Sequence, residues 1–149
     1  MRTIKLIVFA IFSFAILNIL NSCSGDSNNP EKWHAEDLKV LAKDWILVGP
    51  EDEIGSYYEY IFDNFPYVDG IINVYMYENF GTEWEKQFPL PYTHYGVDIL
   101  GNNNERPYSI QYSYDIAVDG TIALKVHISD YYTSLFKPGT TYFRVAVIY

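Results

Sequence analysis

The most regular hydrophobic pattern in the chain has a period of two and lies between residues 108 and 128. Tyrosine and isoleucine alternate with mainly polar residues over Tyr108–Ile116, and aliphatic residues alternate with small or polar ones over Ile122–Ile128. Asp119-Gly120 lies between the two runs and predicts a two-residue turn, because glycine accepts the positive φ that such turns require. The pattern predicts an antiparallel hairpin with one buried and one solvent-facing side. The buried side is expected to hold Tyr108, Ile110, Tyr112, Tyr114, Ile116, Ile122, Leu124, Val126 and Ile128, and the solvent side Lys125 and His127.

Other short runs with the composition of strands occur from residue 45 to the end of the chain. Turn signals such as Gly49-Pro50 and Pro138-Gly139 separate them, and no long helix is indicated. The sequence therefore predicts an all-β domain, an antiparallel β-sandwich of about seven strands with an immunoglobulin-like arrangement. Besides the hairpin, the expected strands are Trp45–Val48, Ser56–Phe62, Gly70–Tyr77 and Thr141–Tyr149.

Two segments of the chain are ambiguous. Glu31–Lys43 is compatible with a short helix begun by Asn29-Pro30, since proline suits a first helical position, or with a first strand. Lys86–Tyr92 contains Pro89 and Pro91, which lack a backbone donor and confine the segment to a sheet edge or a loop.

The first 22 residues have the layout of an export signal. Arg2 and Lys5 precede an apolar run, Leu6–Leu20, which is shorter than the roughly 20 residues of a membrane-spanning helix. Small residues then lead to Cys23, the only cysteine of the chain. A single cysteine cannot form an internal disulfide, so its position after the apolar run requires another explanation.

Leu20-Asn21-Ser22-Cys23 resembles the lipobox of bacterial lipoproteins, with an aliphatic residue three positions before the cysteine and a small residue directly before it. In that family the thiol is joined to diacylglycerol and the signal is cut before the cysteine. The resemblance implies a membrane anchor on Cys23, and Ser24 at the next position is similar to the sorting signal for the outer membrane, on its periplasmic or outer side. An uncleaved signal anchor and an ordinary secreted protein are the alternatives.

The resulting organisation is a signal peptide at residues 1–22, a lipidated cysteine and flexible polar tether at 23–37, and a β-domain at 38–149. Loss of Arg2 and Lys5 with the signal leaves eight basic against 19 acidic residues, a net charge of −11. Such a charge disfavours nucleic acid as a partner and disfavours docking of the domain on anionic lipid headgroups.

Several short motifs carry a second resemblance that covers the chain from Trp45 to its end. They are Trp45–Gly49, Tyr57–Tyr60, Gly70–Tyr77, Leu90-Pro91-Tyr92, the hairpin around Asp119-Gly120, and Phe143-Arg144-Val145. In these the mature chain resembles small β-sandwich lipoproteins of unknown function that are common in Bacteroidota. The resemblance implies a sandwich fold and a place in the cell envelope, and it transfers no active site.

No pattern in the sequence indicates a catalytic or metal site. The histidines at positions 34, 94 and 127 have no metal-ligand spacing, and Glu51-Asp52-Glu53 lacks the spacing of a calcium loop. There is no Gly-x-Ser-x-Gly motif and no glycine-rich phosphate loop between a strand and a helix. We therefore expect neither an enzyme nor a cofactor or metal.

The aromatic content is the unusual feature of the composition, with 15 tyrosines and 3 tryptophans. Trp45 and the strand tyrosines Tyr108, Tyr112 and Tyr114 are expected in the core. Trp84, Tyr131 and Tyr132 fall in expected loops, where they are candidate ligand-binding residues or fill the end of the sandwich. On the outer side of Gly70–Tyr77, Tyr75 and Tyr77 must be covered by a loop or form an exposed aromatic surface.

These features together favour a non-enzymatic binding or assembly accessory held at the cell envelope. The first alternative is a glycan-binding lipoprotein of a polysaccharide-uptake system, and the second is a small hydrolase. Membrane contact is expected through lipid on Cys23, with a glycan or a protein as the further partner.

Overall fold

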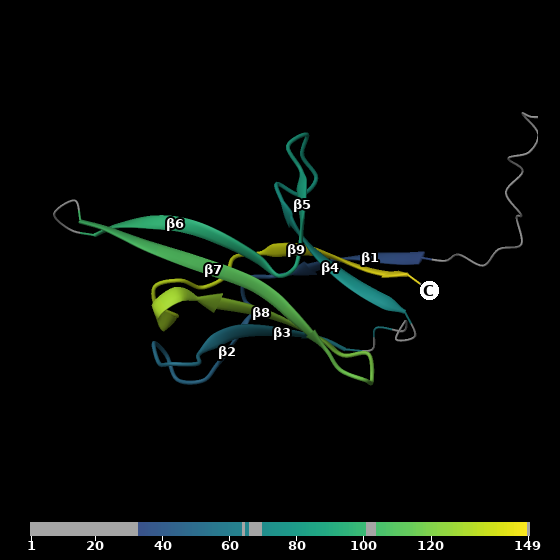
Figure 1. The fold of residues 1–149 in the computed structure, drawn as a ribbon, viewed down its shortest axis with the longest axis horizontal. Coiled ribbons are helices and arrows are strands. Elements are labelled where there is room, and N and C mark those ends of the chain that lie inside the picture. Colours follow the sequence, from purple (N-terminus) through teal and green to yellow (C-terminus); the bar gives the residue numbers. More distant parts are fainter. Residues whose placement is uncertain (1–32, 64, 66–69, 101–103, 149) are drawn as a thin grey trace, which may run out of the picture. The chain divides into compact units, whose positions relative to one another are not determined.

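The computed structural model describes residues 33–63, 65, 70–100 and 104–148. These residues form an all-β domain of two antiparallel sheets with one shared hydrophobic core (Figure 1), which confirms the predicted β-sandwich. The predictions for the signal peptide and for Cys23 concern residues outside these ranges. Within them, no helix is long and apolar enough to cross a membrane.

One sheet has four strands and the other has five. The first has the order β1-β9-β4-β5, with bounds Trp33–Val40, Thr141–Ile148, Ile71–Glu78 and Lys86–Pro89. The second has the order β2-β3-β8-β7-β6, with bounds Ile46–Val48, Tyr57–Phe62, Ile122–Ile128, Asn104–Ile116 and Tyr92–Leu100. A short 3-10 turn, η3 (Ser129–Tyr131), follows β8.

The order of strands contains the immunoglobulin arrangement with one exchange and with an added strand, β6, beside β7. β2, β3, β8 and β7 lie in the order of immunoglobulin strands A, B, E and D, and β9 and β4 lie in the places of F and C. The place beside F, which the last strand G fills in immunoglobulin domains, is here filled by the first strand, β1. β1 and β9 pair antiparallel along their whole length.

The core lies between the two sheets, and along β8 it follows the predicted alternation. Tyr108, Tyr112 and Tyr114 of β7 are partly buried and pack against it. Leu124 and Val126 are fully buried, while Lys125 and His127 lie on the opposite side of β8. Trp45 is buried, and its indole N–H donates a hydrogen bond to the carbonyl of Gly139 at 3.1 Å. The inner residues of β4 and β9 are also buried, namely Val74, Met76, Phe143, Val145 and Val147, and Ile72 is partly buried against them.

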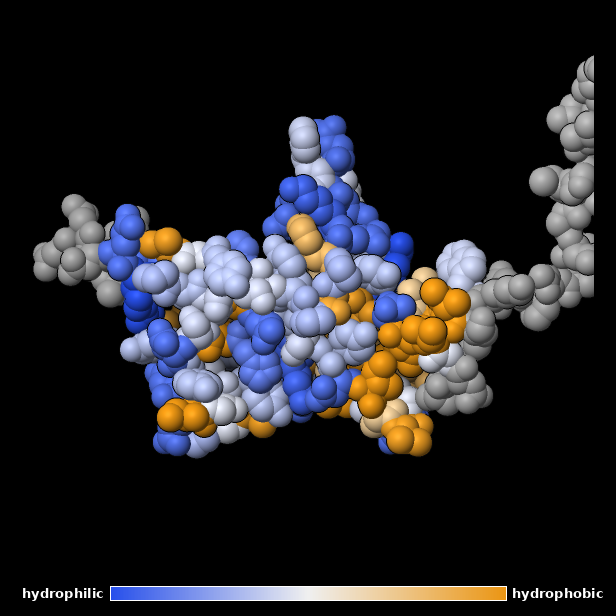
Figure 2. All heavy atoms as spheres, in the orientation of Figure 1, coloured by the Kyte–Doolittle hydropathy of each residue, from blue (hydrophilic) through white to orange (hydrophobic). Residues whose placement is uncertain are grey.

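Apolar side chains are unevenly spread over the surface of the domain. In the view of Figure 2 they gather near the end at which β9 finishes and the turn between β7 and β8 lies, and much of the remaining face is polar.

The structure corrects four details of the sequence-based prediction. Ile116, expected on the buried side of the hairpin, is 41% exposed at the end of β7. The described residues form nine strands, because β1 begins at Trp33, within the expected tether, and β6 follows β5 after two intervening residues. Both strands lie at sheet edges, where the inner face is only partly covered and the alternation is weak. The β7–β8 turn has three residues, Val118-Asp119-Gly120, since the Ala117 N–H still bonds the Thr121 carbonyl at 2.8 Å and Gly120 has φ 88°.

Candidate functional site

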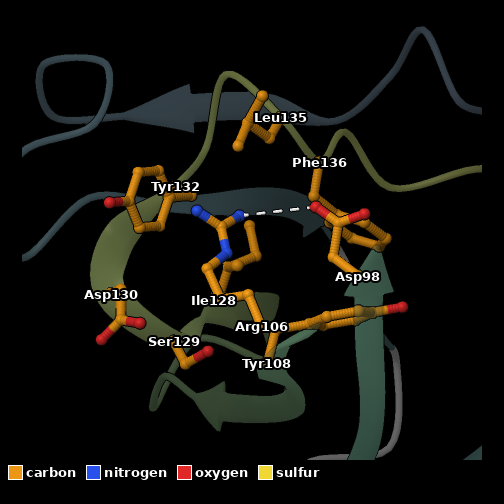
Figure 3. Close-up of a pocket in the computed structure, with 9 residues that line it drawn as sticks. All are labelled: Asp98, Arg106, Tyr108, Ile128, Ser129, Asp130, Tyr132, Leu135 and Phe136. Atoms are coloured by element: carbon orange, nitrogen blue, oxygen red, sulfur yellow. Dashed lines mark ion pairs between the residues drawn. The ribbon is translucent and has the colours of Figure 1, made fainter. Parts of the chain in front are cut away.

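A pocket of about 160 Å³ lies between the β6–β7 hairpin and the chain that follows β8 (Figure 3). Its lining combines aromatic rings with charged side chains, which is typical of a site for a small polar ligand. The lining residues are Asp98, Arg106, Tyr108, Ile128, Ser129, Asp130, Tyr132, Leu135 and Phe136.

Arg106 is the central charged residue of this pocket. Its guanidinium carbon lies 4.2 Å from the centre of the Tyr132 ring, and its Nη2 lies 3.7 Å from Oδ2 of Asp98. Figure 3 shows the guanidinium between these two groups. Stacking on an aromatic face and pairing with a carboxylate both restrict the orientation of the guanidinium, so its remaining donors are directed in advance of ligand binding.

The backbone turn after β8 brings Tyr132 to the pocket. Asp130 and Tyr131 have φ of 58° and 59°, in the left-handed region that non-glycine residues rarely adopt. The Ser109 N–H donates a hydrogen bond of 2.9 Å to Oγ of Ser129, which joins the turn to β7. Two consecutive residues in this conformation reverse the chain tightly, which places Tyr132 opposite Arg106.

The loop that continues from Tyr132 is held by residues from the loop between β2 and β3. Oδ1 of Asp52 accepts the Ser134 N–H at 2.8 Å, and the Ser134 hydroxyl donates to Oδ2. The Asp52 N–H in turn donates to Oγ1 of Thr133 at 3.0 Å. Hydrogen bonds from Ser134 lower the pKa of Asp52 below its ordinary value.

A buried tyrosine holds the same loop from the core side. The Tyr58 hydroxyl donates a hydrogen bond of 2.8 Å to the Thr133 carbonyl. Burial raises the pKa of Tyr58, so this hydroxyl keeps its proton and remains a donor. The pocket wall is therefore positioned from two sides, by Tyr58 from the core and by Asp52 of the acidic run Glu51-Asp52-Glu53 from the neighbouring loop.

Gly96 allows the ring of Tyr108 to lie close against β6. A Cβ at position 96 would lie 2.4 Å from Cζ of Tyr108, well inside van der Waals contact. The two residues are paired across β6 and β7. The glycine thus leaves room for the Tyr108 ring at the pocket.

The three candidate ligand residues from the sequence have different places in the structure. Tyr132 lines the pocket, and Tyr131 lies beside it in η3 but does not line it. Trp84 is 71% exposed in the loop between β4 and β5 and does not line the pocket. None of the three is buried, so none fills the core at the end of the sandwich.

The sequence analysis missed Arg106 and Asp98. They are directly paired in the register of β6 and β7, on either side of the segment 101–103. The sequence does contain a signal for such a pair. The two residues have opposite charges and lie at equal numbers of positions from the centre of that glycine- and asparagine-rich segment.

A second hollow, of about 420 Å³, lies where β4 ends and β9 begins. Its lining is rich in aromatic residues, including Tyr77, Phe80, Tyr92, Tyr112 and Tyr142, together with His94. Phe80 stacks on Tyr142 with ring centres 4.3 Å apart and contacts Tyr77 edge-on at 4.9 Å. Tyr77 is thereby buried under the β4–β5 loop. Of the two alternatives expected from the sequence, cover by a loop or an exposed aromatic surface, the structure shows cover by a loop for this residue.

The Tyr77 hydroxyl also belongs to a charged cluster. It donates a hydrogen bond of 3.1 Å to Oδ1 of Asp37, which is paired with Arg144 at 2.8 Å. Burial, followed by the hydrogen bond to Asp37, raises the pKa of Tyr77 to about 12. Tyr77 is therefore a fixed hydrogen-bond donor within the sheet, with a structural role.

No group of three or more histidine, cysteine, aspartate or glutamate side chains with the geometry of a metal site occurs among the residues that the structure describes. Comparisons of the chain with protein-family models, with curated proteins and with solved structures found no match. Its function must therefore be inferred from its own sequence and geometry.

Proposed function

We propose that this chain is a lipoprotein of the outer membrane, anchored through Cys23, whose sandwich domain is a non-enzymatic module that binds a sugar unit in the Tyr132 pocket. The observation that carries the proposal is the position of Arg106 between the Tyr132 ring and Asp98. Protein sites for sugars need flat apolar surfaces for the ring face and fixed polar groups for the hydroxyls. The pocket provides both.

The size of the pocket limits the ligand. A volume of about 160 Å³ is below the range of pockets that hold drug-sized molecules, and it suits a single sugar ring. Tyr108, Tyr132 and Phe136 supply aromatic surface, and Asp130 and Arg106 supply an acceptor and donors. A terminal sugar or one unit of a chain is therefore the ligand class that we propose.

The same geometry favours binding over hydrolysis. Glycoside hydrolysis requires two carboxyl groups on opposite sides of the scissile bond. Two aspartates line the pocket, but Asp98 is engaged by Arg106, which leaves Asp130 as the one carboxylate in the lining without an ion pair within the described residues. This arrangement supports recognition of a sugar more than its cleavage.

A glycan array probed with the signal-free chain tests the binding proposal. Arg106→Ala should weaken binding to the retained glycans at least tenfold, which corresponds to about 1.4 kcal/mol. Arg144→Ala is a matched control, because Arg144 also pairs with an aspartate, Asp37, and lies 5.3 Å from the ring of Tyr77, outside the pocket. Retention of no glycan, or equal binding by both variants, would reject the proposal.

The anchor is tested separately in cells. A clickable fatty-acid probe should label the wild-type chain and should not label Cys23→Ser. Labelling of the variant to the same degree would reject Cys23 as the lipid site and would leave the binding proposal open to its own test.

A further inference from the structure

Three exposed apolar side chains lie in one row across the outer face of the four-stranded sheet. The register pairs Trp33 of β1 with Ile148 of β9, and Ile148 with Ile71 of β4. Their exposed fractions are 65% for Trp33, 51% for Ile148 and 69% for Ile71. Directly opposed strand residues point to the same face, so these three side chains form one continuous apolar patch.

The patch extends along the sheet by one further row only over β1 and β9. Ala35 and Ala146 give this row two small apolar side chains, and Asn73 of β4 completes it with a polar one. The following row holds the ion pair between Asp37 and Arg144. The apolar surface is thus confined to the end of the sheet at which β1 begins.

Another apolar side chain lies at this end of the domain. The turn between β7 and β8 is at the same end in Figure 1, and its residue Val118 is fully exposed. Figure 2 shows apolar surface from the end of β9 toward this turn. Single exposed apolar residues are common on soluble domains, whereas a contiguous group indicates a surface that something covers.

We propose that the outer-membrane lipid bilayer covers this surface, and that Trp33, Ile71 and Ile148 insert into its interfacial region. The inference rests on the proposed lipid anchor at Cys23. Ten residue steps separate Cys23 from Trp33, so Trp33 lies within about 35 Å of the anchored cysteine even when the chain is fully extended. The patch therefore lies where the anchor enters the domain.

The chemistry of the patch suits a bilayer interface. Tryptophan is enriched at the headgroup level because its ring is apolar and its N–H is polar, and isoleucine adds apolar surface. A local tether raises the effective concentration of the patch at the bilayer, so a contact too weak to bind vesicles alone becomes populated. The net charge of −11 selects a zwitterionic surface over an anionic one.

The bilayer contact would orient the candidate binding site. The patch lies at the end of β9, and the Tyr132 pocket lies at the end of β8 with η3, at the other end of the domain in Figure 1. Contact of the patch with lipid would thus direct the pocket away from the membrane, toward ligands in solution.

Two tryptophans of similar exposure make the test internally controlled. The signal-free chain is coupled through Cys23 to a maleimide lipid in phosphatidylcholine vesicles with or without brominated acyl chains. Trp84→Phe leaves Trp33 as the exposed reporter, and Trp33→Phe leaves Trp84, while the buried Trp45 is common to both. We expect brominated lipid to quench the Trp33 reporter strongly and to leave the Trp84 reporter nearly unchanged.

The vesicle experiment uses a chemical anchor, so it is independent of lipidation in cells, and the two proposals can fail separately. Quenching of Trp33 that is lost on replacing both Ile71 and Ile148 by serine supports the bilayer contact. Equal quenching of both reporters, or none, overturns it. A concentration-dependent dimer in sedimentation without vesicles, abolished by Ile71→Ser, also overturns it, because the patch would then join two copies of the chain. The tryptophan pair retains the original isoleucines and decides the question even if the serine variant fails to fold.

Discussion

Asp52 and Ser134 lie 82 positions apart in the sequence, and the Asp52 carboxylate accepts both the backbone N–H and the hydroxyl of Ser134. The contact joins the β2–β3 loop to the loop that carries the pocket residues Leu135 and Phe136. An acidic surface loop, which the sequence alone offers as a solvated segment or a cation site, thus determines the position of a pocket wall.

Asp52→Asn should weaken ligand binding in the pocket while leaving the core intact. The lowered pKa of Asp52 means that its stabilising effect is complete above the ordinary value of 3.8 and is lost as the pH falls below it. The difference in unfolding free energy between wild type and variant should therefore shrink below this pH, as measured by urea unfolding across an acid series. A difference independent of pH would contradict the assigned role.

Leu124→Ala should lower the free energy of unfolding by about 2–5 kcal/mol, because Leu124 is fully buried between the sheets. Lys125→Ala, one position along, should cost no more than about 1 kcal/mol, since Lys125 pairs with Asp115 on the outer face and lies near the Tyr57 ring. Chemical denaturation of the two variants measures both values. Similar losses would mean that the register of β8 is wrong.

Gly70→Ala should destabilise the domain by about 1–3 kcal/mol, because the new Cβ would lie 2.6 Å from the backbone oxygen of Ile148, and backbone yields little. Gly139→Ala is the matched control. It has no atom within 4 Å of the new Cβ, so it should be neutral or slightly stabilising. Thermal unfolding of both variants provides the comparison, and a tolerated Gly70→Ala would show that β4 and β9 are less closely packed than described.

His127 should make the domain less stable in mild acid. Burial, followed by the charge of Lys125, lowers the pKa of His127 below its ordinary value of 6.5, and the Asp115 charge opposes this only in part. Its ring stacks on Tyr57 with centres 5.0 Å apart. The unfolded chain takes up a proton near pH 6.5 that the folded chain resists, so stability is lost as the pH falls through and below this value. His127→Gln should flatten this part of the stability profile, and an unchanged profile would contradict the shift.

The sequence predicted the central strands well because buried apolar residues alternate along them with less buried ones. In β8 every inward residue is aliphatic and buried, and β9 alternates in the same way from Phe143 to Val147. β6 was missed because it is an edge strand whose inward positions include His94, Gly96 and Asp98. At such an edge, side chains of the partner strand cover the inner face, as Tyr108 does over Gly96. The edge strand itself therefore shows little alternation of apolar and polar residues.

The candidate site was predictable only in part for a similar reason. Tyr132 could be selected because an aromatic residue in a loop has no evident partner in the sequence. Arg106 and Asp98 become neighbours only through the register of β6 and β7, and the wall depends on Asp52, from another loop. Contacts at such sequence separations follow from tertiary packing, which a local pattern does not encode.

The pairing of β1 with β9 places a constraint on the order in which the domain folds. Trp33 pairs with Ile148, so among the described residues β1 has a single sheet neighbour, β9, which follows it by about a hundred positions. Synthesis runs from the amino terminus, and β1 must wait until Thr141–Ile148 has emerged before it gains a partner. β4 also pairs with β9, so the four-stranded sheet is completed only when β9 is present, and a chain truncated before Thr141 would lose two of the three pairings of that sheet at once.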